Sequence, residues 1–452
     1  FSAGRAVEEK SIAELQAEMR AGRTTSERLV RAYLARIEAI DQRGPGLHSV
    51  LAVNPDAIAQ ARALDDERRA GHVRGPLHGV PILVKDNIET LDPMATTAGS
   101  LALAGNVTGR DAPVIARLRA AGAIILGKTN LSEWANFRST RSTSGWSSRG
   151  GQTKNPYVLD RNPCGSSSGT GTAASFWVAN VGTETSGSIL SPANANRLAA
   201  VKPTVGRISR YGIIPITADQ DTAGPMARSV TDAAILLGVL EGAAPDSNDP
   251  ATSRCARETD YTKYLDRGAL RGARIGIPRA YFYDAAKAPG SPEPQGGLDA
   301  PHAAAMAAAI EILKREGAIV VDPADIPSVV DADPEGNFLN WSICRSLDEA
   351  KTKRCSIDFA YGMERDFNLW LASLGPASPV ATLTELRQWN RDHQKAGTLK
   401  YGQALLDFSD AMDPEIYRPR YEADRAKDLE LTATHGIDEA MATHRLDALP
   451  RG

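Results

Sequence analysis

The chain has 452 residues, of which 42% are hydrophobic and 24% charged, and its formal net charge is −3. This composition is typical of a folded globular protein and excludes a wholly disordered chain. The 52 basic and 55 acidic residues form no long run of either sign, which argues against nucleic acid or an anionic membrane as a partner. No uncharged apolar stretch reaches the roughly 18 residues that a membrane-spanning helix needs.

Amphipathic helices are predicted at the start of the chain. Apolar positions recur three and four residues apart over 11–22 and 26–40, and Ser26 is expected to cap the second of these helices. A third helix is predicted over 56–70, where the many Arg and Asp residues indicate a solvated outer face.

The pattern then changes to that of an α/β protein. The apolar runs at 80–84 and 123–127 lack alternation, as expected of strands buried on both faces of a parallel sheet, and a helix is predicted between them at 111–121. The same alternation returns later, with a strand near Ile275, a helix over 302–315 and a strand ending at Asp322. The order of elements therefore predicts an α/β fold.

Two segments are predicted to be loops. Residues 139–171 are dense in Ser, Gly, Arg and Asn, and this stretch is too long for an idle connection in a compact domain, so a functional role is expected for it. Residues 285–297 are rich in Pro and Gly and are predicted to be a surface loop or an insertion.

Three features carry candidate chemistry: Lys85 directly after the first buried strand, the loop GSSSGTG at 165–171, and the segment GTETSGSI at 182–189. Ligands of open α/β sheets bind beyond the carboxyl ends of the strands, which is where Lys85 would lie. Desolvation there would lower the pKa of the lysine and allow it to accept a proton near neutral pH. A serine hydroxyl needs such a base to become a nucleophile. The T-S-G-S run adds successive backbone N–H groups and a glycine for the turn, which suits the binding of an oxyanion.

In this order and with these flanks, the segments resemble the amidase signature family. The resemblance covers about 77–228 and rests on GPLHGVPILVKDNI, GAIILGKTNLSEWANFR, NPCGSSSGTG, GTETSGSI, VKPTVGRISRYGIIP and DTAGPMARSVTDAA. It implies one domain over 1–452, with a large mixed, twisted β-sheet covered by helices on both faces. Within that domain, a helical layer is expected over 1–70, the catalytic core over 71–240, and the remaining α/β part over 241–452.

The resemblance also implies roles for particular residues. Lys85 is expected to be the base, Ser166 to relay the proton from a cis peptide bond, and Ser188 to be the nucleophile. The other implied residues are an oxyanion hole from the backbone of Thr185, Ser186, Gly187 and Ser188, and orienting hydroxyls from Ser167 and Thr183. The WANFR and GWSSRGGQTKNPY segments look like those of bacterial peptide amidases, which places Trp134 and Asn136 near the substrate; packing of Trp134 beneath the loop is an equal alternative.

Other site chemistries are less well supported. Of the seven histidines, three precede the Ser/Gly motifs and four follow far behind them, which argues against a Ser-His-Asp triad, and Asp86 is expected to hold local backbone. The four cysteines form no C-x-x-C pair, so neither a metal nor another cofactor is expected, and their pairing is left open. The first residue is Phe1, which leaves open a removed leader and a cytoplasmic, periplasmic or secreted location.

The chain departs from the family pattern in three places. The interval from Ser166 to Ser188 is about two residues short, and a helix that lost two residues would turn its far end by about half a turn. Arg197 and Ala200 occupy positions where the family usually has glycine. The C-terminal end, LDALPRG, looks incomplete beside relatives that continue the sheet.

The sequence therefore predicts an amide hydrolase that forms a covalent acyl-enzyme and acts on a small-molecule or peptide amide as a monomer or homodimer. Release of ammonia from C-terminal peptide amides is the leading expectation. An ammonia-producing amidotransferase subunit, and a binding or assembly protein with an inactive site, are the alternatives.

Overall fold

The computed structural model describes residues 7–450. The chain forms two compact units, which are described separately. The first unit comprises the residues up to Tyr264 together with Gly362–Ala411, and the second comprises Leu265–Tyr361 together with the residues from Met412 onward. The division falls at Tyr264, beyond the boundary near residue 240 expected from the sequence, and a later segment returns to the first unit.

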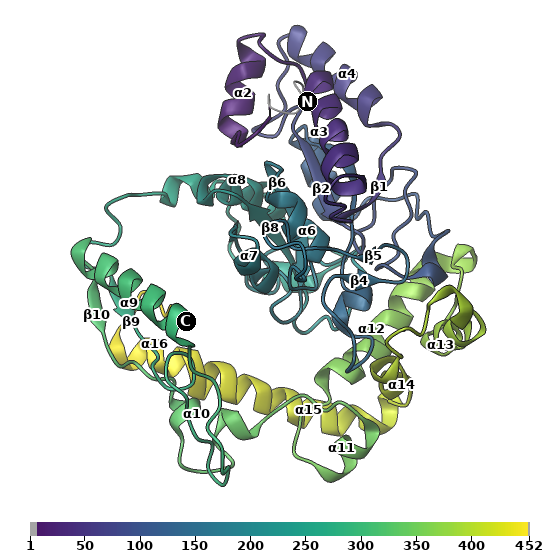
Figure 1. Cartoon of the computed structure of the whole chain (residues 1–452). Helices are drawn as coiled ribbons and strands as arrows, with labels where there is room; N and C mark the ends of the chain where they lie inside the picture. Colours follow the sequence, from purple (N-terminus) through teal and green to yellow (C-terminus); the bar gives the residue numbers. More distant parts are fainter. Residues whose placement is uncertain (1–6, 451–452) are drawn as a thin grey trace. The chain divides into compact units, whose positions relative to one another are not determined.

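The first unit is built on a six-stranded mixed sheet, which confirms the α/β fold class (Figure 1). The strand order is β1-β3-β2-β6-β8-β7; β2 runs parallel to both of its neighbours, whereas β8 runs antiparallel to β6 and β7. The strands are β1 (Val50–Val53), β2 (Pro81–Lys85), β3 (Ile124–Thr129), β6 (Ala179–Glu184), β7 (Ala199–Ala200) and β8 (Thr222–Ala227).

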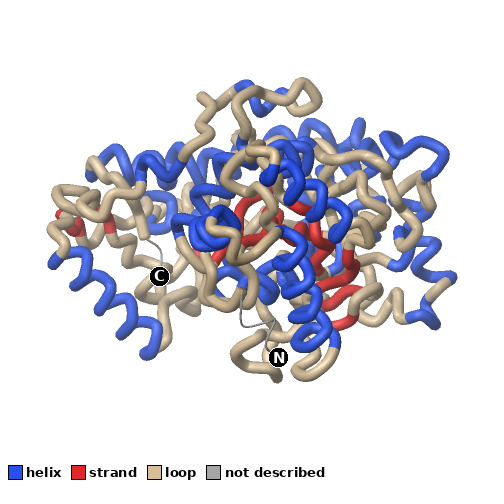
Figure 2. Tube along the Cα trace, turned by 90° about the horizontal axis from the view of Figure 1, so that it is seen from above, coloured by secondary structure: helices blue, strands red, loops and turns tan. Residues whose placement is uncertain are grey.

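Helices surround this sheet, as Figure 2 shows for the strands drawn in red. α4 and α5 contact β3, α6 contacts β6 and β2, and α8 contacts β8. The helices of the unit are α2 (Ile12–Arg20), α3 (Ser26–Arg36), α4 (Ala57–Arg69), α5 (Pro113–Ala120), α6 (Ser168–Ala174), α7 (Leu190–Ala195), α8 (Val230–Glu241), most of α12 (Asp358–Leu374), α13 (Leu383–Asp392) and α14 (Ala404–Asp410).

The predicted N-terminal helices are confirmed, but one predicted cap is wrong. Thr25, not Ser26, caps α3, because its side chain accepts the N–H of Arg28 while Ser26 is already the first helical residue. Ser11 caps α2 in a reciprocal pair with Glu14.

The predicted loop at 139–171 contains a short hairpin, β4 (Trp146–Ser147) with β5 (Gly151–Gln152), and α6 begins before the loop was expected to end. The helix starts at Ser168, inside the GSSSGTG segment. Short stretches rich in Ser and Gly can therefore enter a helix where the surrounding core is already packed.

The second unit contains the later α/β elements predicted from the sequence. Its strands β9 (Arg274–Gly276) and β10 (Ile319–Val321) pair in parallel. A disulfide joins Cys344 to Cys355, while Cys164 and Cys255 are free thiols. The helices of this unit are α9 (Ala300–Arg315), α10 (Pro327–Val330), α11 (Leu347–Thr352), α15 (Pro414–Leu429) and α16 (Asp438–His444). Across residues 7–450, no helix has both the length and the apolar character to cross a membrane.

Candidate active site

Lys85 is the last residue of β2, which lies between β3 and β6 near the middle of the sheet. All five residues of this strand are buried, and the side chain of Lys85 is 0% exposed. The ammonium group is therefore carried out of water by an apolar strand, as the sequence predicted.

The Nζ atom of Lys85 donates hydrogen bonds to three neutral oxygen atoms. Its partners are Ser166 Oγ at 2.8 Å, Thr183 Oγ1 at 2.9 Å and the carbonyl of Thr183 at 3.1 Å. Burial lowers the pKa of Lys85 to about 7, although the carboxylates of Asp221 and Glu184 oppose this shift. A substantial fraction of neutral amine is thus present near neutral pH, at hydrogen-bond distance from a serine hydroxyl.

Ser166 lies on a cis peptide bond with Gly165, as the family resemblance implied. Its side chain is almost fully buried, and its carbonyl accepts the N–H groups of Ser132 at 3.0 Å and Ser168 at 2.8 Å. The hydroxyl of Ser166 is consequently held at the end of the lysine side chain by backbone on both sides.

Ser167 joins the Ser/Gly loop to the end of β6. Its Oγ donates to the carbonyl of Thr183 at 2.9 Å and accepts the N–H of Thr183 at 3.2 Å. Its own N–H donates to the carbonyl of Ser188 at 3.0 Å. Gly182 allows this close approach, since a Cβ atom there would lie 2.9 Å from Ser167 Oγ. The segments that carry Ser166 and Ser188 therefore lie against each other despite the short interval between them.

The turn that carries Ser188 is organised by the carboxylate of Glu184. This carboxylate accepts the N–H of Gly187 at 2.8 Å, of Ile189 at 2.7 Å and of Leu190 at 3.0 Å. Gly187 has a φ of 79°, a left-handed conformation in which glycine is favoured over other residues.

The backbone N–H groups of the turn differ in their availability. That of Gly187 is already bonded to Glu184. The hydrogen bonds found within residues 7–450 include none from the N–H of Ser186 or Ser188. Two donors beside the Ser188 hydroxyl are therefore available for an oxyanion.

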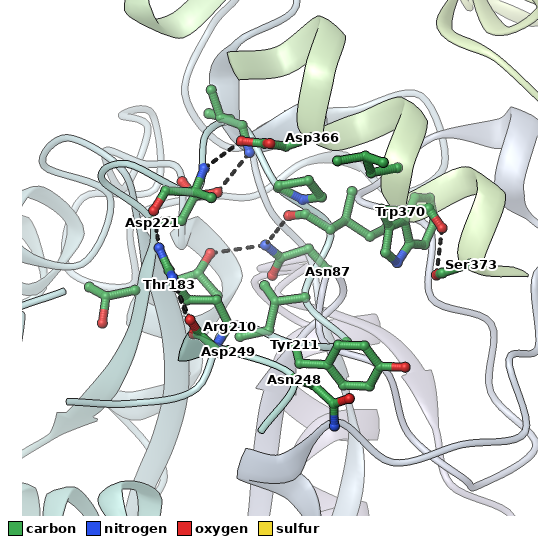
Figure 3. Close-up of a pocket in the computed structure, with 18 of the residues that line it drawn as sticks. Asn87, Thr183, Arg210, Tyr211, Asp221, Asn248, Asp249, Asp366, Trp370 and Ser373 are labelled. Carbon is green, nitrogen blue, oxygen red and sulfur yellow. Dashed lines mark hydrogen bonds and ion pairs between the residues drawn. The ribbon is translucent and has the colours of Figure 1, made fainter. Parts of the chain in front are cut away.

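A cavity of about 360 Å³ opens beside this network and is drawn in Figure 3. Thr183 and Thr185 contribute to it from the end of β6, and Asn87 Nδ2 donates to Thr183 Oγ1 at 3.0 Å. One apolar wall comes from the segment 213–216, and another from Leu369 and Trp370 of α12. Its charged residues have charged or polar partners; Arg210, for example, pairs with Asp249.

The segment around Trp134 has an unusual backbone. Trp134, Ala135 and Asn136 have φ values of 55°, 52° and 71°, three consecutive left-handed residues without a glycine. Ala135 lines the cavity, whereas Trp134 is buried with its ring edge-on to Phe367 at 5.2 Å, and Asn136 is exposed. The packing alternative for Trp134 agrees with this arrangement, and substrate binding by Trp134 and Asn136 stays a prediction.

Two positions that depart from the family pattern are accommodated differently. Arg197 adopts a φ of 57°, the left-handed conformation that glycine would adopt without strain, and its guanidinium lies over the ring of Tyr157 at 5.1 Å. Ala200 lies in β7 and pairs with Met226.

Asp86 has the local role expected of it. Its carboxylate accepts the hydroxyl of Thr97 and the N–H of Gly99, and its backbone carbonyl accepts the N–H groups of Thr97 and Ala98. It therefore holds the loop that follows β2.

Sequence reasoning assigned no role to Glu184 or Asp221. Glu184 could have been noticed because it directly precedes the T-S-G-S turn motif and is spaced to cap it. Asp221 could not, because its contact with Thr185 depends on the antiparallel pairing of β6 with β8.

The chain is similar to several known proteins along most of its length. The Amidase family model matches residues 28–352. A probable amidase of Arabidopsis thaliana is 36% identical over 449 residues, which are 98% of this chain and 79% of that protein. A protein of Arthroderma benhamiae is 46% identical over 318 residues, 70% of this chain and 51% of the relative, so the chain spans about half the length of that relative.

Two further similarities bear on the reaction. The crystal structure of a peptide amidase from Stenotrophomonas maltophilia is 42% identical with a TM-score of 0.84, covering 98% of this chain and 83% of that chain. A glutamyl-tRNA(Gln) amidotransferase subunit of Chloroflexus aurantiacus is 41% identical over 315 residues, 69% of this chain and 60% of the relative.

Proposed function

Since this chain belongs to the amidase signature family and is an enzyme of the amidase type, we propose that it deamidates C-terminal peptide amides through an acyl-enzyme on Ser188. The observation that carries the proposal is the 2.8 Å hydrogen bond between Nζ of the buried Lys85 and Oγ of Ser166, in a loop that is itself bonded to Ser188. The lowered pKa of Lys85, about 7, supports its role as the base. The products are the free peptide acid and ammonia.

In the proposed acylation step, Lys85 and Ser166 first remove the proton of Ser188 and then return it to the leaving group. Neutral Lys85 takes the proton of Ser166, Ser166 takes that of Ser188, and the Ser188 oxygen attacks the amide carbonyl carbon. The oxyanion accepts the N–H groups of Ser186 and Ser188, with Thr185 as a further proposed donor. The N–H of Gly187, which the family resemblance also implied, is bonded to Glu184 instead. The proton returns through Ser166 to the amide nitrogen, which leaves as ammonia, and water then hydrolyses the ester by the same relay.

The cavity supports a neutral peptide amide as the substrate. Its walls include Ile213, Ile214, Pro215, Leu369 and Trp370, which suit an apolar side chain near the scissile bond. The arginines that line it are already paired, Arg110 with Glu89 and Arg210 with Asp249, so the pocket offers no uncompensated cation to an anionic substrate.

The test is ammonia release from an N-acetylated dipeptide amide. The unsubstituted protein is expected to release ammonia, and Lys85→Ala, Ser166→Ala and Ser188→Ala to lose at least about 1,000-fold in kcat/KM. Ser191→Ala, an exposed serine three residues beyond Ser188, is the matched control and should retain full activity. Full activity of Lys85→Ala or Ser188→Ala would contradict the assignment.

An ammonia-producing amidotransferase subunit is the second candidate, because of the similarity to the protein of Chloroflexus aurantiacus. It predicts inactivity towards peptide amides alone and ammonia release from glutamine when a partner protein is present. Labelling of Ser188 by a fluorophosphonate probe would support either enzyme, and its absence in folded protein would support an inactive site.

A further inference from the structure

Asp221 lies at the point where β8 begins. The antiparallel register pairs Glu184 with Thr222, so Asp221 comes opposite the residue that follows β6. The hydroxyl of Thr185 donates to one carboxylate oxygen of Asp221, and the N–H of Ile216 donates to the other at 2.9 Å. Asp221 is 9% exposed and lines the same cavity as Thr183 and Thr185 (Figure 3).

Asp221 therefore connects two parts of the site. Thr185 is the first residue of the T-S-G-S turn that leads to Ser188, and Ile216 belongs to the apolar wall of the cavity. One carboxyl group fixes both through separate oxygen atoms.

We infer that Asp221 is a positioning residue for the proposed amide hydrolysis: it holds the turn before Ser188 through Thr185, and its negative charge raises the pH at which Lys85 becomes the base. This inference rests on the proposed function.

The charges around the two groups support this coupling. Lys85 is influenced by Asp221 and by Glu184; Asp221 is influenced by Asp366 of α12 and by Arg210. Burial raises the pKa of Asp221 to about 7, and Asp366 adds to this rise, whereas the Thr185 hydroxyl, the Ile216 N–H and Arg210 oppose it. Both groups therefore titrate in the same range, and a negative charge on Asp221 favours the ammonium form of Lys85.

The sign of the coupling follows from Coulomb attraction. When Asp221 and Lys85 hold one proton between them, two forms are possible. In the first the proton lies on the Asp221 carboxyl group and Lys85 is a neutral amine; in the second Asp221 is a carboxylate and Lys85 is an ammonium group. The first form is active, because only a neutral Lys85 accepts a proton. Removing the carboxylate abolishes the second form, so Lys85 loses its proton at a lower pH.

The experiment measures kcat/KM for a peptide amide against pH. In Asp221→Asn the midpoint of the acidic limb should fall by about half a pH unit or more. Thr185→Val keeps the carboxyl group but removes a donor that stabilises its anion, so its midpoint should fall by less. Asp366→Asn removes a charge that disfavours the Asp221 anion, so its midpoint should rise.

Asp160→Asn, in an exposed loop of the same unit, is the matched control and should leave the midpoint unchanged. Thermal unfolding and the pH dependence of Ser188 labelling by a fluorophosphonate check that each variant is folded and report the same titration without turnover. Should Asp221→Asn fail to fold, the opposite shifts expected of Thr185→Val and Asp366→Asn decide the question.

An active Asp221→Asn protein whose midpoint is unmoved or raised overturns this inference alone, and so do equal shifts in Thr185→Val and Asp366→Asn. Absence of both ammonia release and Ser188 labelling in the unsubstituted protein overturns the proposed function, and this inference with it.

Discussion

The protonation state of Lys85 should govern the pH dependence of the proposed reaction. Its pKa lies near 7, well below the 10.5 of a lysine in water, because burial disfavours the ammonium form. As the pH rises through this value Lys85 loses its proton, so kcat/KM should rise between about pH 6 and 8 and then level off.

Ammonia release at a series of pH values measures this profile. Thermal unfolding midpoints recorded at the same pH values should all stay well above the assay temperature, which separates the titration of Lys85 from a loss of folded protein. A rate that first rises near pH 10, or that falls between pH 6 and 8, would contradict a buried lysine base.

Among the individual site residues, the sequence predicted the positions of those that follow directly from local sequence patterns. Lys85 could be placed because an apolar run precedes it. The Ser/Gly motifs indicated two candidate loops, and the family resemblance singled out Ser166 and Ser188 within them. Asp221 could not be placed, because its partner Thr185 lies 36 residues earlier and meets it only through strand pairing. Neither could the occupied N–H of Gly187, which depends on the side-chain conformation of Glu184.

The position of the segment that links α6 to β6 is fixed by Trp177. This residue is 1% exposed, its ring stacks on Tyr33 with centroids 4.0 Å apart, and its Nε1 donates to the carbonyl of Pro81 at 3.1 Å. The link lies in the interval that is predicted from the sequence to be short relative to the family pattern, and this large side chain anchors it.

Trp177→Ala should therefore lower the free energy of unfolding by about 3 to 5 kcal/mol, since it leaves a cavity and an unpaired carbonyl. Tyr157→Ala, at a side chain that is 51% exposed, should cost less than about 1 kcal/mol. Chemical denaturation of both variants measures the difference, and equal losses would show that Trp177 is not an anchor.

The strands show why some elements could be predicted from the sequence and others could not. β2 and β3 are continuous apolar runs, and both were predicted. β8 contains Gly224 and Pro225, residues that are uncommon inside central strands, yet it lies between β6 and β7. Its position is set by pairing with β6, which no local pattern records.

For the whole molecule, the sequence did not determine how the chain divides. Residues 362–411 belong to the first unit although the residues on either side of them belong to the second. Domain boundaries placed at single points along the sequence cannot describe a later segment that belongs to an earlier unit. The fold class was nevertheless predictable, because the alternation of apolar strands and helices survives in both units.

The disulfide between Cys344 and Cys355 should stabilise the second unit. It closes a loop with a sequence separation of 11, for which restriction of the unfolded chain contributes about 2 to 3 kcal/mol. The double variant Cys344→Ser/Cys355→Ser should lower the unfolding midpoint in a thermal scan, whereas Cys255→Ser, at a free thiol, should change it little.

A thiol titration checks the pairing itself. Protein denatured without reductant should show two reactive thiols, and four after reduction. Four thiols before reduction of freshly oxidised protein would contradict the bond.

The carboxylate of Glu184 has a consequence for how the chain tolerates change. Because it gathers three N–H groups between residues 187 and 190, the shape of the Ser188 turn is encoded within seven consecutive residues. The turn is thus held largely by its own residues, and Ser167 and Asp221 are its contacts with other segments. A shorter stretch between Ser166 and β6, as predicted for this chain from its sequence, would therefore leave the shape of the turn that presents Ser188 unchanged.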